Sequence, residues 1–114
     1  MKKILTLLAL TISFIMNAQL TAVTEGGNTG QRLSTSNASN HGNIGSDAVD
    51  LSVQSLASST RGATGFKAVA MGSNTTASGS ISTAIGNANE ASGTFSTSMG
   101  VSTLASGYGS TSMG

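Results

Sequence analysis

Residues 63–114 read ATGFKAVAMGSNTT (63–76), ASGSISTAIGNANE (77–90), ASGTFSTSMGVSTL (91–104) and ASGYGSTSMG (105–114). Glycine recurs at every seventh position of this stretch, and a small Ala or Ser lies two residues before each glycine. The residue directly before the glycine alternates between Ser or Thr and the larger Met or Ile, so the full period is fourteen residues. Such fixed self-similarity is typical of a stack of identical supersecondary units. The repeat glycines are Gly65, Gly72, Gly79, Gly86, Gly93, Gly100, Gly107 and Gly114.

Three other repeat architectures do not fit this stretch. A coiled coil needs branched apolar residues at two positions of each heptad, whereas the invariant residue here is glycine, which costs about 1 kcal/mol inside a helix. Collagen needs proline and a three-residue period, and the chain has no proline. The calcium-binding nonapeptide repeat needs aspartate, which residues 63–114 lack.

A β-strand pattern fits each unit. In residues 82–85, small Ser82 and Ala84 alternate with the larger Thr83 and Ile85, which places the two kinds on opposite faces of a strand. Each half-unit then supplies one strand and a turn at a glycine that can take positive φ, so the pattern predicts a flattened two-strand coil and no helix outside residues 4–16. The larger face, a candidate trimer or core face, comprises Val69, Met71, Thr83, Ile85, Thr97, Met99, Thr111 and Met113.

The pattern leaves open which strand face points into the coil. One coil cannot stand alone, because ordering fourteen residues costs on the order of 14–28 kcal/mol while one buried Met or Ile returns about 1.5–3 kcal/mol. Stacking between coils and contacts with other chains must supply the rest. We favour the small face inside a narrow roll and the Met/Ile face against neighbouring subunits, although the reverse arrangement also fits the pattern.

The units, running as A-S-G-x-x-S-T-A-M/I-G with polar residues between, resemble the head repeats of YadA-like trimeric autotransporter adhesins. The resemblance covers residues 63–114. It implies an all-β fold, a left-handed parallel β-roll with three chains side by side. It also implies display outside a Gram-negative cell and attachment to host or matrix surfaces.

Residues 1–18 have the features of a secretory signal peptide. Lys2 and Lys3 precede an apolar stretch at 4–16, and Ala18 is the small residue before a cleavage site. Without this segment the net charge is −1, which leaves no basic patch for nucleic acid. The chain has no cysteine and therefore no disulfide framework. The residues that set this charge are Arg32, Arg61, Lys67, Glu25, Asp47, Asp50 and Glu90.

Residues 19–62 are predicted to form an irregular leader. Turn clusters at 26–30 and 40–43 flank a strand-like alternation at 48–53 that puts Val49, Leu51 and Val53 on one face. A solenoid end exposes unpaired backbone groups, so we expect the leader to cap the first coil. A receptor-binding tip is the alternative.

No catalytic, cofactor or metal site is predicted. His41 is the only histidine, and a triad with Asp47 or Asp50 and a serine is a poor interpretation, because a polar loop histidine is usually solvated. Metal binding by the same residues lacks a recognised ligand spacing. The glycines at 26–30 lack the Lys-Ser/Thr of a phosphate-binding loop. An enzyme is therefore not expected.

Two functional classes remain. The first is an adhesin head, and the second is a structural shaft resembling a phage tail fibre, in which the repeat only sets length. The signal peptide favours the adhesin. We expect a homotrimer from residue 19 onward, and a reading frame that continues past Gly114 with further units and an anchoring region.

Overall fold

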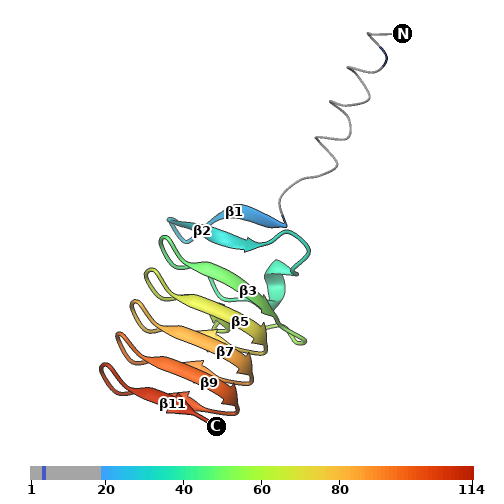
Figure 1. The fold of residues 1–114 in the computed structure, drawn as a ribbon. Helices are drawn as coiled ribbons and strands as arrows, with labels where there is room; N and C mark the ends of the chain where they lie inside the picture. Colours follow the sequence, from blue (N-terminus) through green and yellow to red (C-terminus); the bar gives the residue numbers. More distant parts are fainter. Residues whose placement is uncertain (1–3, 5–18) are drawn as a thin grey trace.

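A computed structural model of the chain describes Ile4 and residues 19–114. The predicted signal peptide at 1–18 lies, apart from Ile4, outside these described residues. The described part is all-β apart from Ile4 and a single turn of 3₁₀ helix, η1 (Ala38–Asn40). The strands stack into a solenoid (Figure 1), which confirms the predicted all-β roll of repeated coils.

Two sheets form the walls of the solenoid. The seven-stranded sheet has the order β1-β2-β3-β5-β7-β9-β11, and the four-stranded sheet has the order β10-β8-β6-β4. Every pairing is parallel except that of β1 with β2, which form an antiparallel hairpin. The larger sheet comprises β1 (Leu20–Glu25), β2 (Asn28–Leu33), β3 (Val49–Val53), β5 (Val69–Ser73), β7 (Thr83–Asn87), β9 (Thr97–Val101) and β11 (Thr111–Met113). The smaller sheet comprises β4 (Gly62–Ala63), β6 (Thr76–Ala77), β8 (Glu90–Ala91) and β10 (Leu104–Ala105).

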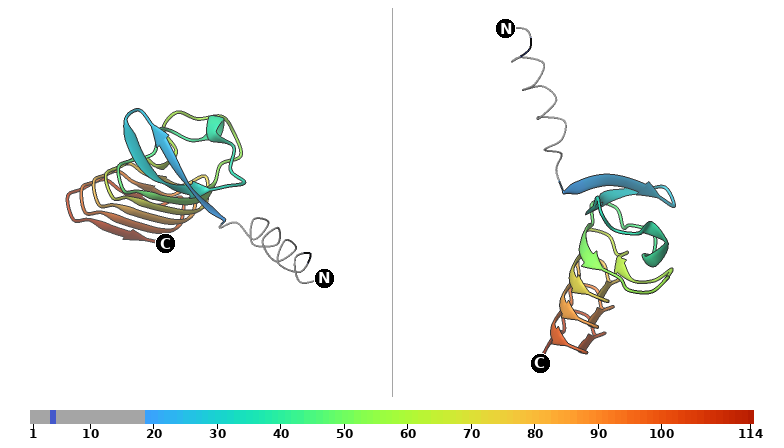
Figure 2. Two further views of the ribbon diagram at one scale, coloured as in Figure 1. Left: turned by 90° about the horizontal axis from the view of Figure 1, so that it is seen from above. Right: turned by 90° about the vertical axis from the view of Figure 1, so that its right-hand side faces the viewer.

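The solenoid extends beyond the repeats into the segment expected to be irregular. β3 already has the repeat register, because Val49 pairs with Val69, and β2 pairs with β3 in parallel. The β1–β2 hairpin lies across the end of the stack (Figure 2). The segment at 19–62 is therefore more ordered than its sequence suggested, and it covers the first coil.

The small strand face lies inside the roll. Ala70, Ala84 and Ser98 are fully buried and stack on one another along the seven-stranded sheet, while Met71 and Met99 point outward. In the smaller sheet, Ala77 and Ala91 are buried in the same way. Among the described residues, the only large aliphatic side chain in the core is Ile44.

Glycine is required for the spacing between coils. A Cβ atom built at Gly79 would overlap the carbonyl oxygen of Gly93 in the next coil, and Gly65 stands in the same relation to Gly79. Backbone hydrogen bonds hold these coils together, for example from Gly79 N to Ala91 O at 3.1 Å. Because parallel strands lie about 4.8 Å apart, there is no room for a side chain between the stacked glycines.

The repeat glycines do not all take the positive φ that the sequence pattern predicted for the turns. Gly72, Gly86 and Gly100 do have positive φ, but Gly65, Gly79 and Gly93 do not. Non-glycine residues occupy the left-handed region in the turns instead, and they recur with the repeat. They are Lys67, Ile81 and Phe95 at one edge of the roll, and Asn74, Ala88 and Ser102 at the other.

We predict that Gly79→Ala lowers the free energy of unfolding by about 1–3 kcal/mol or more, because the new methyl group must push two coils apart. The exposed neighbour provides a matched control, since Ser78→Ala introduces the same side chain without a clash. Thermal unfolding followed by circular dichroism measures both. Equal stability of the two variants would show that stacking does not require glycine at this position.

Candidate functional site

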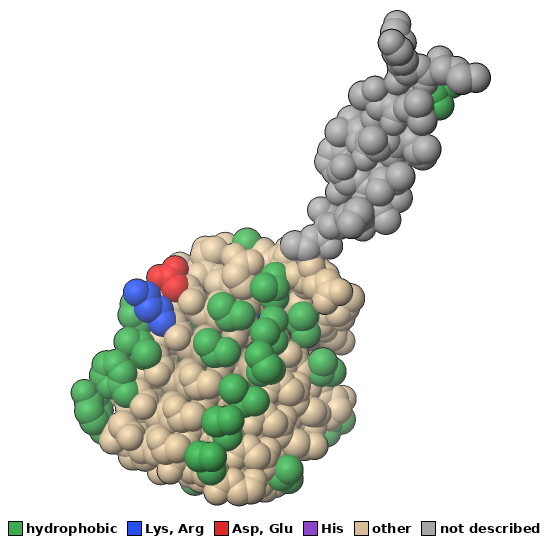
Figure 3. Space-filling model, in the orientation of Figure 1, with side chains coloured by type: hydrophobic (Ala, Val, Ile, Leu, Met, Phe, Trp, Pro, Cys, Tyr) green, Lys and Arg blue, Asp and Glu red, His purple; other side chains and the backbone are tan. Residues whose placement is uncertain are grey.

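The outer face of the seven-stranded sheet carries the larger side chains. Val69, Thr83, Thr97 and Thr111 form one row across the strands, and Met71, Ile85, Met99 and Met113 form another. None of the eight is buried, and the exposed fractions of Met71 and Met113 are 40% and 71%. Figure 3 shows hydrophobic side chains in a stripe down this face. The predicted trimer or core face is thus open to solvent in the single chain.

A second apolar group lies along one edge of the roll. Phe66, Ile81, Phe95 and Tyr108 are all at least 44% exposed. The rings of Phe95 and Tyr108 pack edge to face with their centroids 5.5 Å apart, and the Lys67 ammonium lies 5.1 Å from the Phe66 ring centroid. Phe95 thus packs on Tyr108, and all four side chains are exposed on the outside of the roll.

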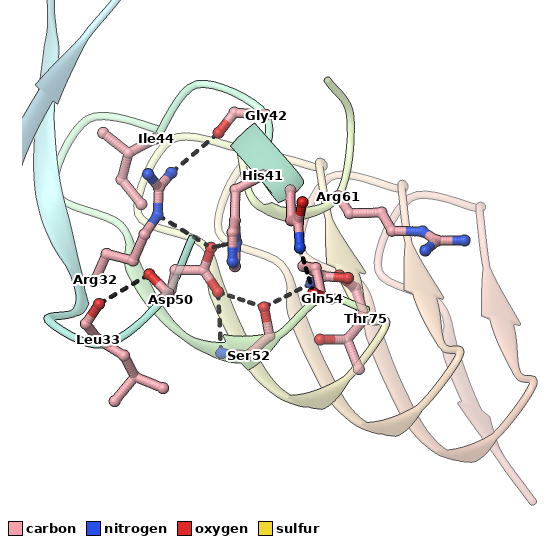
Figure 4. A network of polar contacts seen from close by, with 12 residues as sticks. Arg32, Leu33, His41, Gly42, Ile44, Asp50, Ser52, Gln54, Arg61 and Thr75 are labelled. Atoms are coloured by element: carbon pink, nitrogen blue, oxygen red, sulfur yellow. Dashed lines mark hydrogen bonds and ion pairs between the residues drawn. The ribbon is translucent and has the colours of Figure 1, made fainter. Parts of the chain in front are cut away.

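The capped end contains a buried polar network, drawn in Figure 4. Its centre is Arg32 on β2, which is 2% exposed and occupies the position that pairs with Asp50 on β3. The Arg32 guanidinium donates two hydrogen bonds to the Glu25 carboxylate, at 2.7 and 2.9 Å, and one to the Gly42 carbonyl at 3.0 Å. Arg32 thereby ties the hairpin to the loop that follows it.

Asp50 is the acceptor in the second half of the network. One carboxylate oxygen lies 2.8 Å from His41 Nδ1 and 3.7 Å from Arg32 Nε. The other accepts hydrogen bonds from the Ser52 backbone N–H and hydroxyl. Asp50 itself pairs in register with Ala70, so a carboxylate fills the interior position that holds a methyl group one coil later.

The network continues into the next coil through Gln54. Its side-chain amide donates to the Ser52 hydroxyl at 2.7 Å and to the Thr75 carbonyl at 3.0 Å. A chain of polar contacts therefore runs from the hairpin to the loop between β5 and β6, and it links the end of the solenoid to the first repeat.

Both carboxylates of the network are stabilised in the charged form. The hydrogen bonds from Arg32 hold the pKa of Glu25 below its ordinary value, against the opposing effect of burial. Burial raises the pKa of Asp50, but hydrogen bonds from His41 and Ser52 outweigh it and leave that pKa lowered as well. The buried Arg32 thus lies beside two ionised carboxylates.

The arrangement does not provide a catalytic triad. His41 and Asp50 do form the base and acid pair, but the Ser52 hydroxyl donates to Asp50 and not to the imidazole. A nucleophile must instead hydrogen-bond to the base. Asp47 is exposed and takes no part in the network. No group of three potential metal ligands occurs among residue 4 and residues 19–114.

A polar groove of about 810 Å³ lies beside the network, on the side of the four-stranded sheet. Its floor comes from Thr64, Thr76, Ser78 and Glu90, and its walls come from the loops around η1 and at 58–60. His41 lines the groove and also belongs to the network. The groove and the outer apolar face lie on different sheets of the roll.

Comparison with known families identifies the repeats. The YadA head domain repeat matches twice, over residues 63–89 and 91–114. These residues are YadA head domain repeats. No curated protein and no solved structure matches the chain.

YadA head repeats belong to trimeric autotransporter adhesins of the bacterial cell surface, where they are structural and adhesive rather than enzymatic. The matched residues contain all eight repeat glycines. In the structure, Gly72, Gly86 and Gly100 are the penultimate residues of β5, β7 and β9, and the other repeat glycines lie one or two residues after a strand. In the part of the chain that the structure describes, no helix is long and apolar enough to cross a membrane.

Sequence reasoning missed the network that precedes the YadA head repeats. The sequence identifies Arg32 and Glu25 only as charged residues, and it offers Asp50 as a further charge and as a member of a triad or metal site that the spacing does not support. One signal was present: the alternation at 48–53 places Asp50 and Ser52 on the face opposite Val49 and Leu51. A carboxylate on the small inner face needs a buried cation or donors.

We predict that the cap is sensitive to acid. Because the folded-state pKa values of Glu25 and Asp50 are lowered from 4.5 and 3.8, the unfolded chain binds protons more tightly. The stability that both carboxylates contribute is therefore present at neutral pH and lost as the pH falls through their folded pKa values. Thermal unfolding midpoints should fall steeply below about pH 4.

The variant Asp50→Asn tests whether the ionised Asp50 carboxylate stabilises the cap. Removing one partner of a buried charge pair should lower the free energy of unfolding at pH 7 by about 3–5 kcal/mol and flatten the acid dependence. Asp47→Asn is the control, because Asp47 is exposed and asparagine tolerates its positive φ. If the two variants are equally stable at pH 7, the network does not stabilise the cap.

Proposed function

We propose that this chain is the head of an exported trimeric adhesin on the surface of a Gram-negative bacterium, and that it attaches the cell to host or matrix surfaces. The observation that carries the proposal is the pair of YadA head repeats at 63–89 and 91–114. The signal peptide predicted at 1–18 supports export.

The distribution of apolar side chains supports a trimer. Within the described residues the interior holds mainly Ala and Ser, while Met71, Met99 and Met113 remain exposed on one sheet. Burying a Met or Ile side chain is worth about 1.5–3 kcal/mol, so association through this face adds the apolar burial that a thin roll lacks. Contact between the seven-stranded sheets of three chains around a threefold axis would bury the exposed rows of larger side chains.

A structural shaft is the second candidate. It is favoured by the regular stack from β5 to β9, in which each strand repeats the register of the one before. Such a stack sets length and trimeric register without a ligand. A binding experiment separates the two functions, because a shaft does not adhere.

We predict that Ile85→Asp weakens trimer assembly more than Thr76→Asp does. Ile85 lies on the outer face of the seven-stranded sheet, so the variant puts three carboxylates into the proposed interface, whereas Thr76 lies on the other sheet. Light scattering of the purified full chain measures the mass of each variant. A folded wild-type monomer at micromolar concentration contradicts the trimer, and equal effects of the two variants show that the interface is elsewhere.

Adhesion tests the function itself. Cells that produce the protein should bind surfaces coated with extracellular-matrix extract several-fold better than cells from which the gene is deleted. Albumin-coated surfaces are the control for nonspecific attachment. If producing and deleted cells attach equally to every surface tested, including host cells, the shaft is the better interpretation.

A further inference from the structure

We propose that the groove at the capped end binds a neutral saccharide. The inference deepens the adhesive function and rests on it in one respect, namely that the saccharide is displayed on the surface to which the head attaches. Side chains from the hairpin, from both leader loops and from the repeats meet in this groove.

The chemistry of the lining points to this class of ligand. Apart from Gly42, every residue of the groove presents a hydroxyl, an amide, an imidazole or a carboxylate. None is a lysine or arginine, and the single acidic residue is Glu90. Many neutral donors and acceptors with one carboxylate suit a ligand that is rich in hydroxyl groups, and the missing cations disfavour sulfated or sialylated ligands.

His41 connects the groove to the buried polar network. Asp50 is ionised and can only accept hydrogen bonds, so Nδ1 of the imidazole must carry the proton in their 2.8 Å contact. The His41 side chain is only 1% exposed, so the exposed hydroxyls and amides of the other lining residues make the contacts that a ligand can reach.

The walls of the groove are departures from the repeat. Two residues separate β5 from β6, whereas eight separate β3 from β4, and this longer loop contributes Ser58, Ser59 and Thr60 to the groove. A solenoid does not need such an insertion to stack its coils. Irregular loops on a regular scaffold commonly carry binding functions.

The insertion is held in place before any ligand arrives. Asn40 Nδ2 donates to the Gln54 carbonyl at 2.8 Å, and the Ser58 backbone N–H donates to the Ser39 carbonyl at 3.2 Å. The Gly42 N–H donates to the Arg61 carbonyl at 2.9 Å. Both loops are therefore tied to each other, which reduces the entropy lost when a ligand binds.

The groove stays accessible in the proposed trimer. Figure 2 shows η1 and its neighbouring loop on the side of the roll away from the seven-stranded sheet. Association through the Met/Ile face therefore leaves the four-stranded sheet and its groove open to the surroundings. Three equivalent grooves near one end of a trimer also permit multivalent binding, which raises avidity without new contacts.

Binding of the purified full chain to an array of neutral, sialylated and sulfated oligosaccharides tests the inference. We expect the hits to be neutral, and at least a tenfold loss of their binding in Ser78→Arg, whose long side chain fills the groove. Ser106→Arg is the matched control: it lies at the same position of a later unit, is exposed, and is not part of the groove. It should bind within twofold of wild type. Glu90→Gln should weaken binding several-fold by removing charge-assisted acceptors.

The outcomes distinguish a failure of the saccharide site from a failure of the adhesive function. If cells adhere but no neutral oligosaccharide binds, the saccharide inference is wrong while the adhesin stands. Binding that is equal in Ser78→Arg and Ser106→Arg, or restricted to sialylated or sulfated oligosaccharides, also overturns it. If neutral oligosaccharides bind through the groove but cells do not adhere, the saccharide site stands and the adhesive function fails.

Discussion

The stacking of glycine on the backbone of the next coil is the constraint on which the rest of the structure depends. At Gly65, Gly79 and Gly93 a methyl group would overlap the carbonyl oxygen of the following coil. Coils this close form continuous ladders on both walls, and a coil of only fourteen residues leaves no room inside for large side chains. Ala and Ser must therefore fill the interior, and Met and Ile must face outward. The apolar exterior therefore follows from the short coil, which the glycines allow to stack.

The buried ions at the capped end follow from the same narrow interior. Where the hairpin meets the first coil, the inner position is filled by Arg32 and then Asp50 instead of a methyl group. Burying either charge alone costs several kcal/mol, so each must meet partners, and Glu25, His41 and Ser52 provide them. Such directional contacts fix the hairpin and the loop relative to the stack more specifically than Ala packing can.

The repeat could be predicted from the sequence because its information is local and redundant. Each strand between Val69 and Val101 is specified by the same alternation and the same glycine. The cap could not, since Glu25 reaches Arg32, and Arg32 reaches Asp50, only after the hairpin has folded over the first coil. The groove was beyond sequence reasoning for a similar reason: Ser58 and Ser39 come together through an insertion whose path no periodicity encodes.

In the turns, the register in which the coils stack determines the backbone conformation. The conformational preference of the individual residue does not. Lys67, Ile81, Phe95 and Gly109 occupy one turn position with φ between 51° and 63°, although a β-branched residue such as isoleucine strongly disfavours that region. The ladders on both sides fix the turn, and the strain of about 1–3 kcal/mol is absorbed by them. The backbone conformation at this turn position is therefore independent of the side chain. As a result, the position can hold a cationic, an aliphatic or an aromatic side chain. One rigid repeat can thus present different surface chemistry from coil to coil, as the trimeric adhesin that we propose requires.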